Sequence, residues 1–177
     1  MISADYIYYL FAVVIFVVLK AIYPMADHEQ LLFILKPTNM LVELFTGNSS
    51  IYDATQGYYY PDLHITIEKS CSGFNFWLIA FALSIVVSLN YMKTKIAKVL
   101  ITPCMLFLSY ILTLFVNTSR IVASIKTNDF VETFSDHPIS WLHQAEGSFI
   151  YLLFLILFYS ALQFFYTNYF IRHEKLT

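Results

Sequence analysis

Four long apolar stretches constrain the fold of this 177-residue chain more than any other feature of its sequence. An α-helix needs about 20 apolar residues to cross the roughly 30 Å hydrocarbon core of a membrane. The stretches that meet this requirement cover residues 6–23, 73–91, 96–121 and 147–170. The second and fourth contain no charged residue, and the charges of the other two lie near their ends. The sequence therefore predicts an all-α integral membrane protein built as a four-transmembrane-helix bundle.

The composition supports a membrane protein and excludes several other classes. Hydrophobic residues make up 59% of the chain and charged residues only 12%, about half the charged fraction of a soluble domain. A net charge of −2 argues against a protein that binds nucleic acid by neutralising phosphates. Two cysteines are too few for a disulfide scaffold, and their spacing is not that of a zinc knuckle or a redox pair. We predict a single membrane domain over residues 1–177.

A fifth apolar stretch, residues 31–45, is shorter and is interrupted by Lys36 and Pro37 in its middle. It is too short to span a membrane, so we predict a pair of short helices that are interfacial or re-entrant. Residues 63–68 alternate between apolar and polar, which predicts one short strand or an extended segment. We expect the rest of the ordered chain to be helical.

The distribution of charge predicts the orientation in the membrane. If the four helices alternate in direction, the side with both termini carries five basic and two acidic residues, a net charge of +3. The other side carries five basic and ten acidic residues, a net charge of −5. Because basic residues in short loops mark the cytoplasmic side, we predict a multi-pass protein of the cell membrane with both termini in the cytoplasm. Outward loops are then expected at residues 24–72 and 122–146.

Polar residues at the outward ends of the predicted helices are the candidates for function, because charged groups at membrane depth are costly. Cys71 is expected in the first turn of the second helix, where unpaired N–H groups and the helix dipole favour the nucleophilic thiolate. A small packing residue at a helix start is the alternative interpretation. Cys104 has no charged residue within a helical turn and is expected to pack as a neutral thiol.

Two further groups lie at predicted helix ends. Arg120 shares a helix face with Asn117, three residues earlier, and fits either a functional group or an anchor for lipid phosphate. His143 precedes the fourth stretch, and Gly147, four residues later, leaves a gap beneath it. His137 supplies a second imidazole nearby, and either histidine also fits an ordinary interfacial residue.

These residues suggest one shared site. Three adjacent helix ends of a four-helix bundle lie close together, with about 10 Å between neighbouring axes. A thiol beside an imidazole is an activated nucleophile, and a guanidinium stabilises an oxyanion or lowers the pKa of the thiol. We therefore predict that Cys71, Arg120 and His143 meet on the outward side and act on a carbonyl at the membrane surface.

The same residues, in the same order, resemble the motifs of the exosortase/archaeosortase family of membrane cysteine transpeptidases. The residues that carry the resemblance are Cys71-Ser72-Gly73, Asn117-Thr118-Ser119-Arg120-Ile121, and His143 with Gly147. It covers roughly residues 68–155, and the chain is similar in size to small members such as the exosortase K group. The family's acidic residue before the cysteine has a counterpart only in Glu68, to which we assign no role.

The resemblance implies a membrane cysteine protease or transpeptidase. Its substrates would be secreted proteins with a C-terminal sorting signal, which consists of a short motif, one transmembrane helix and a basic cytoplasmic tail. Cys71 would attack a backbone carbonyl of the motif and form a thioester, His143 would transfer protons, and Arg120 would stabilise the oxyanion. The supporting residues would be Asn117, Ser72 and Gly147.

The resemblance also bears on partners and cofactors. A second nucleophile, from a lipid-linked or glycan acceptor, would release the product. Membrane lipids would surround the protein, and neither a cofactor nor a metal nor a nucleic acid is implied. The alternative from another class is a non-enzymatic four-span assembly factor or scaffold subunit, whose polar residues at the membrane edge bind lipid or a partner helix.

Replacement of the two histidines tests which imidazole transfers protons. We expect His143→Ala to abolish processing of a sorting signal and His137→Ala to leave most of it, because the helix that follows His143 gives it a fixed platform. The measurement is the fraction of substrate cleaved in cells that carry each variant. The reverse result would overturn the choice of histidine but not the mechanism.

Overall fold

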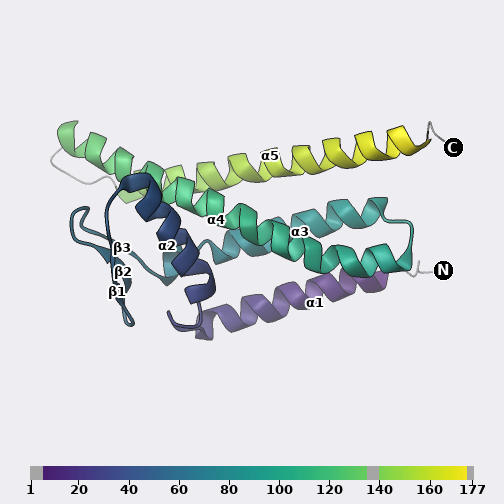
Figure 1. Cartoon of the computed structure of the whole chain (residues 1–177), viewed down its shortest axis with the longest axis horizontal. Helices are drawn as coiled ribbons and strands as arrows, with labels where there is room; N and C mark the ends of the chain where they lie inside the picture. The colour runs from purple at the N-terminus through teal and green to yellow at the C-terminus, as the bar shows by residue number, and fades with distance from the viewer. Residues whose placement is uncertain (1–5, 135–139, 175–177) are drawn as a thin grey trace. The chain divides into compact units, whose positions relative to one another are not determined.

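The computed structural model describes the backbone of residues 6–134 and 140–174, and the side chains of residues 6–127 and 145–169. Within these residues, four helices are long and apolar enough to cross a membrane: Tyr6–Met25, Lys69–Tyr91, Lys95–Thr127 and Ala145–Tyr169. The four predicted spanning helices are therefore confirmed. Figure 1 shows all of the helices and strands along the chain.

The helices are α1 (Tyr6–Ile22), α2 (Leu32–Thr46), α3 (Phe74–Tyr91), α4 (Lys95–Phe134) and α5 (Ser140–Glu174), with short 3₁₀ turns η1 (Tyr23–Met25) and η2 (Lys69–Cys71). The strands are β1 (Ile51–Asp53), β2 (Gly57–Tyr60) and β3 (Ile65–Ile67). The chain forms two compact units. Unit 1 comprises Met1–Pro24, Asn75–Ile111 and Leu153–Thr177, and unit 2 comprises Met25–Phe74 and Leu112–Leu152. This division describes which residues pack together and does not test whether either unit folds alone. The single membrane domain therefore stays a prediction.

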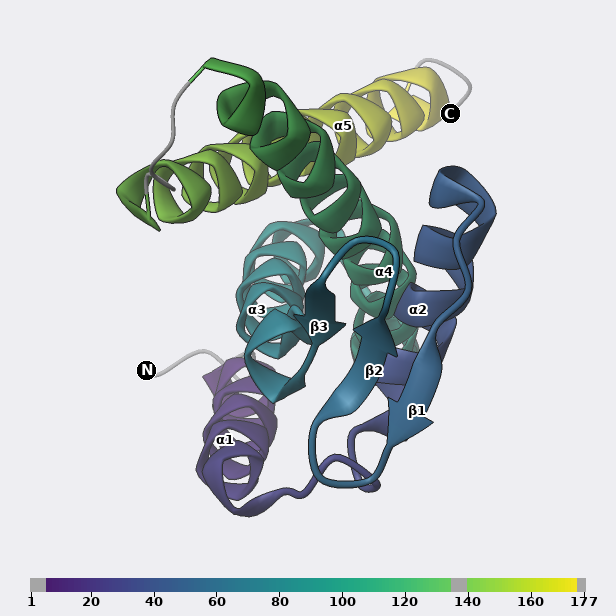
Figure 2. The same ribbon diagram turned by 90° about the vertical axis from the view of Figure 1, so that its left-hand side faces the viewer.

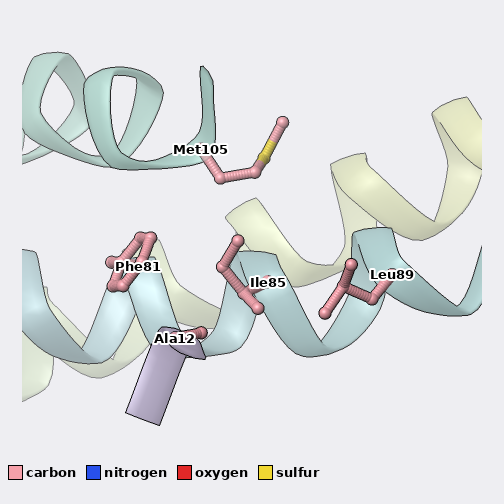
Figure 3. Close-up of a cluster of buried hydrophobic side chains, with 5 residues drawn as sticks. All are labelled: Ala12, Phe81, Ile85, Leu89 and Met105. Carbon is pink, nitrogen blue, oxygen red and sulfur yellow. The ribbon is translucent and has the colours of Figure 1, made fainter. Parts of the chain in front are cut away.

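In unit 1, a stripe of α3 forms the centre of the helix packing. Phe81, Ile85 and Leu89 recur every four residues and so lie on one face of the helix, where they are buried. They pack with Ala12 of α1 and Met105 of α4, as Figure 3 shows. The small side chain of Ala12 leaves room for the α1 backbone to lie close to the larger side chains of α3.

The outer surfaces of α1 and α5 are apolar and exposed. In the most apolar 18-residue stretch of α1 and of α5, only 6% is buried. The corresponding stretch that includes α3 is 67% buried. Exposed apolar side chains on a helix long enough to span are satisfied by contact with lipid. The burial pattern therefore places α3 at the centre of unit 1, with α1 and α5 facing lipid.

Unit 2 contains a small sheet that the sequence predicted only in part. Its three antiparallel strands follow the order β1-β2-β3, and Figure 2 shows them side by side. The expected short strand at residues 63–68 is present as β3, but β1 and β2 were not predicted. The three consecutive tyrosines of β2 fit an interfacial belt, but aromatic residues after a turn are also typical of a strand.

The segment at residues 31–45 forms one helix, α2, and not the predicted pair of short helices. Pro37 lies inside α2, and the helix ends at Gly47, whose φ of 73° is a left-handed value that suits glycine. Ile34, Leu35 and Val42 are buried, whereas Met40 and Leu44 are exposed. A helix with apolar residues on both its buried and its exposed face suits the predicted interfacial or re-entrant position.

The predicted outward loop at residues 122–146 is largely helical. Helix α4 continues for 40 residues to Phe134, and α5 begins at Ser140 instead of near residue 147. The prediction ended the third helix at the polar residues near Arg120. Polar residues end an apolar stretch without ending a helix, and residues 122–134 contain neither glycine nor proline.

A polar cluster joins α2 to the segments around the sheet. The Tyr60 hydroxyl donates a hydrogen bond to Oδ1 of Asn39 at 2.6 Å, and Nδ2 of Asn39 donates to Oγ of Ser50 at 2.8 Å. The backbone N–H and the hydroxyl of Ser50 both donate to Oε1 of Glu43, at 2.9 and 2.6 Å. These bonds from Ser50, together with a weaker one from Nδ2 of Asn39 at 3.2 Å, lower the pKa of Glu43 below its ordinary value of 4.5. Burial raises the pKa of Tyr60.

The lowered pKa of Glu43 predicts an acid-sensitive contact. The pKa of Glu43 in the folded protein lies below its unfolded value. The contact therefore contributes its full stabilisation of the fold above about pH 4.5, and this stabilisation is lost as the pH falls through the folded pKa. In hydrogen–deuterium exchange, we expect residues 47–50 to exchange faster in Glu43→Gln than in the unsubstituted chain at pH 7. This difference between the two proteins should disappear at acid pH. A difference that stays constant down to pH 3 would contradict the prediction.

Candidate functional site

Cys71 ends a 3₁₀ turn that directly precedes α3. The turn η2 covers Lys69–Cys71, and α3 begins only at Phe74, so the prediction that Cys71 lies in the first turn of the helix was wrong. Gly73 has a φ of 72°, which lets the chain leave the turn and enter the helix. The backbone N–H of Phe74 donates to Oγ of Ser72 at 3.3 Å, so the buried Ser72 helps to cap α3. The positive end of the α3 dipole therefore lies at this cap and not at the thiol of Cys71.

The thiol of Cys71 is half-buried and has a polar neighbour. Its Sγ lies 3.7 Å from Oγ of Ser70, and the Ser70 hydroxyl donates to Oε1 of Glu68 at 2.7 Å. A hydroxyl has one proton, so with that proton on Glu68 the thiol is the donor in the contact with Ser70. Glu68 thus lies two hydrogen bonds from the sulfur.

Asn117 of α4 connects this turn to the helices. It is fully buried, and its Nδ2 donates to the carbonyl oxygen of Cys71 at 2.6 Å. A Cβ atom at Gly73 would lie 2.9 Å from Cγ of Asn117, a distance that real Cβ atoms essentially never show. Glycine is therefore required at position 73 for two reasons, its backbone conformation and the close approach of α4.

Asn117 in turn belongs to a hydrogen-bonded chain that ends at Arg120. Its Oδ1 accepts a hydrogen bond from the Tyr151 hydroxyl of α5 at 2.7 Å. Nη1 of Arg120 donates to the same hydroxyl oxygen at 3.2 Å, and the guanidinium carbon lies 5.2 Å from the centre of the Tyr151 ring. The ring adds a cation–π attraction. The chain of bonds runs from Arg120 through Tyr151 and Asn117 to the Cys71 carbonyl.

Gly147 makes room for the arginine. A Cβ atom there would lie 2.5 Å from Nε of Arg120 and 3.3 Å from both Cδ and Cζ. The guanidinium thus packs against the α5 backbone at position 147, where only glycine leaves enough space. Nε of Arg120 is buried and has no hydrogen-bond partner in the part of the chain whose side chains are described.

A carboxylate lies one residue before this glycine. Oε1 of Glu146 accepts a hydrogen bond from the Thr127 hydroxyl of α4 at 3.0 Å. Its other oxygen, Oε2, is buried and has no partner among residues 6–127 and 145–169. Over the same residues, no group of three or more His, Cys, Asp or Glu side chains is arranged to hold a metal ion.

The structure brings most of the predicted site residues into unit 2. Cys71, Ser72, Asn117, Arg120 and Gly147 all belong to it. Asn117 bonds to the Cys71 carbonyl, Tyr151 connects Asn117 to Arg120, and Gly147 packs against Arg120. The connection reaches the backbone of Cys71 and not its sulfur.

Three of the residues considered in the sequence lie elsewhere or are not described. Position 143 is in α5, but its side chain is outside the described residues, as is all of His137. Cys104 is an exposed, free cysteine in the unit 1 part of α4.

Tyr151 is the site residue that the sequence analysis missed. Tyrosines near the ends of membrane helices are typical of an interfacial belt, so the sequence pattern alone gives them no chemical role. A signal was nevertheless present, because Tyr151 follows Gly147 by four residues and therefore shares its helix face. The face of α5 that carries the predicted gap beside His143 also carries this phenol.

Comparison with known proteins gives one result. The chain matches the model of a family described as transmembrane exosortase over residues 6–160. No match was found among curated proteins or among solved structures.

The close contact at Gly147 predicts a destabilising alanine substitution. Alanine in place of a helical glycine ordinarily stabilises by about 0.5–1 kcal/mol, but here the new methyl group must displace the Arg120 side chain. We expect Gly147→Ala to destabilise by about 1–3 kcal/mol, the usual range for overpacking. The measurement is thermal unfolding in detergent, with Ser148→Ala at the adjacent exposed position as the control. A higher unfolding temperature for Gly147→Ala would contradict the prediction.

Proposed function

The chain belongs to the transmembrane exosortase family, and from this premise we propose that it cleaves the C-terminal sorting signals of secreted proteins through a Cys71 thioester. Membership of the family indicates a membrane peptidase or transpeptidase. The residues and the substrate class are our proposal. The observation that carries it is the chain of hydrogen bonds from the Cys71 carbonyl through Asn117 and Tyr151 to Arg120.

This connection suits acyl transfer because it joins the backbone of the proposed nucleophile, Cys71, to a cation, Arg120. The Cys71 thiol is half-buried, so it is neither sealed in the interior nor fully solvated. The guanidinium is always charged, and it is fixed by a hydrogen bond, a ring and a helix backbone. A fixed positive charge near a thiol stabilises negative charge that develops during attack on a carbonyl.

The proposed reaction proceeds in two steps. In the first, Sγ of Cys71 attacks a backbone carbonyl of the sorting motif, and His143 accepts the thiol proton. The tetrahedral intermediate then collapses, the C–N bond breaks, and His143 returns the proton to the leaving amine. A thioester and a free amine result. In the second step, a hydroxyl, amine or water attacks the thioester and releases the thiol.

The geometry of Arg120 suggests which of its N–H groups acts on the oxyanion. Nη1 donates to Tyr151, and Nε is buried against the backbone at Gly147. We therefore assign oxyanion stabilisation to Nη2. Loss of one such donor typically lowers kcat by about 10²–10³-fold.

The membrane determines which partners fit this role. A substrate with one transmembrane helix would pack in lipid beside the enzyme helices, so that its motif lies at the depth of Cys71. We propose that the site faces outward from the cell membrane, with both termini in the cytoplasm. A lipid-linked or glycan precursor is the proposed acceptor.

Cysteine replacement tests the proposed function. We expect Cys71→Ala to abolish processing because no thioester forms, whereas Cys104→Ala, at the exposed position in unit 1, should retain it. Mass spectrometry of the unsubstituted protein, quenched with acid during processing, should find a substrate peptide attached to Cys71. Full processing by Cys71→Ala would instead support a non-enzymatic assembly factor or scaffold.

A further inference from the structure

We propose that Tyr151 is a positioning residue of this reaction. Its hydroxyl holds the Arg120 guanidinium at a fixed position relative to the turn that contains Cys71. The proposal rests on the proposed function. It concerns a residue that touches neither the sulfur nor, by our assignment, the substrate. Its role is exerted through Arg120.

The directions of the hydrogen bonds at Tyr151 are determined by its partners. The amide of Asn117 must present Nδ2 to the Cys71 carbonyl, because a carbonyl only accepts. Oδ1 of Asn117 therefore faces Tyr151 and accepts its hydroxyl proton at 2.7 Å. The hydroxyl oxygen still has lone pairs, and one of them accepts from Nη1 of Arg120 at 3.2 Å. The Tyr151 hydroxyl thus donates to Asn117 and accepts from Arg120, so the hydrogen bonds run in a single direction from Arg120 to the Cys71 carbonyl.

The chemistry of the partner matters as much as its position. In the described part of the chain, the hydrogen-bond partner of Arg120 is this neutral phenol, and no carboxylate pairs with the guanidinium. A carboxylate would hold the arginine as firmly but would cancel much of its field at a nearby oxyanion. A phenol holds the side chain and leaves its charge available. This combination is what an oxyanion-stabilising arginine requires.

Phenylalanine at position 151 isolates the effect of the hydroxyl. Tyr151→Phe keeps the ring and therefore the cation–π contact at 5.2 Å, but it removes the acceptor for Nη1 and the donor to Asn117. Among the described residues, the ring and the backbone at Gly147 then hold the arginine. A displacement of about 1 Å in a reacting geometry commonly costs about 10²-fold in rate.

Two small reagents distinguish positioning of Arg120 from a general structural role. p-Nitrophenyl acetate acylates a thiol through a tetrahedral oxyanion, forms a thioester and releases p-nitrophenolate and a proton. Iodoacetamide alkylates the same thiol by displacement of iodide, with no oxyanion. A residue that acts only through Arg120 should affect the first rate and not the second.

The experiment measures both rates at Cys71 on the full chain in lipid nanodiscs, in a Cys104→Ala background. We expect Tyr151→Phe to lower the acylation rate by about 10–100-fold and to leave the alkylation rate within about twofold. Tyr159→Phe is the matched control, since Tyr159 lies two turns further along α5 and its hydroxyl bonds to Gln163 in unit 1. It should change neither rate.

A double variant supplies a second test. If Tyr151 acts through Arg120, then Arg120→Ala lowers acylation by at least as much, and adding Tyr151→Phe to it lowers the rate no further. Equal losses in acylation and alkylation for Tyr151→Phe, or additive losses in the double variant, would overturn the proposal. Acylation that persists unchanged in Cys71→Ala would instead refute the proposed function itself.

Discussion

The hydrogen bond from Asn117 to the Cys71 carbonyl is the contact on which the rest of the site depends. It joins the turn before α3 to α4. The oxygen Oδ1 of the same amide accepts a hydrogen bond from Tyr151 and so joins α4 to α5. The amide is fully buried, so breaking either bond would leave polar atoms without partners in a medium that penalises them. Three segments that are distant in the sequence are thereby held in one arrangement.

This arrangement requires two glycines, each for a measurable steric reason. Gly73 lets Asn117 reach the turn, and Gly147 lets Arg120 lie on the α5 backbone. Small residues at helix contacts are common in membranes, where apolar side chains gain little by leaving lipid and close packing supplies much of the attraction. In this protein, the same close approach also brings polar groups within hydrogen-bond distance of each other.

The two units of the chain differ in the side chains that they bring together. Unit 1 buries an apolar stripe of α3 and leaves α1 and α5 apolar and exposed, as a lipid-facing assembly does. Unit 2 contains the sheet, the Glu43 cluster and the chain from Arg120 to Cys71. A charged arginine is tolerated there because Tyr151 and the helix backbone hold it.

The amino-acid sequence by itself determined the four spanning helices, because the hydrophobicity of a stretch is a local property that adds up residue by residue. It also indicated Cys71, Asn117, Arg120 and Gly147, since polar residues and glycine at the edge of an apolar stretch stand out without knowledge of the fold. Only the tertiary structure decided that Cys71 precedes α3 and that Tyr151 joins the site. The Tyr151–Asn117 bond connects residues 34 positions apart, and which distant residues meet depends on how the helices pack.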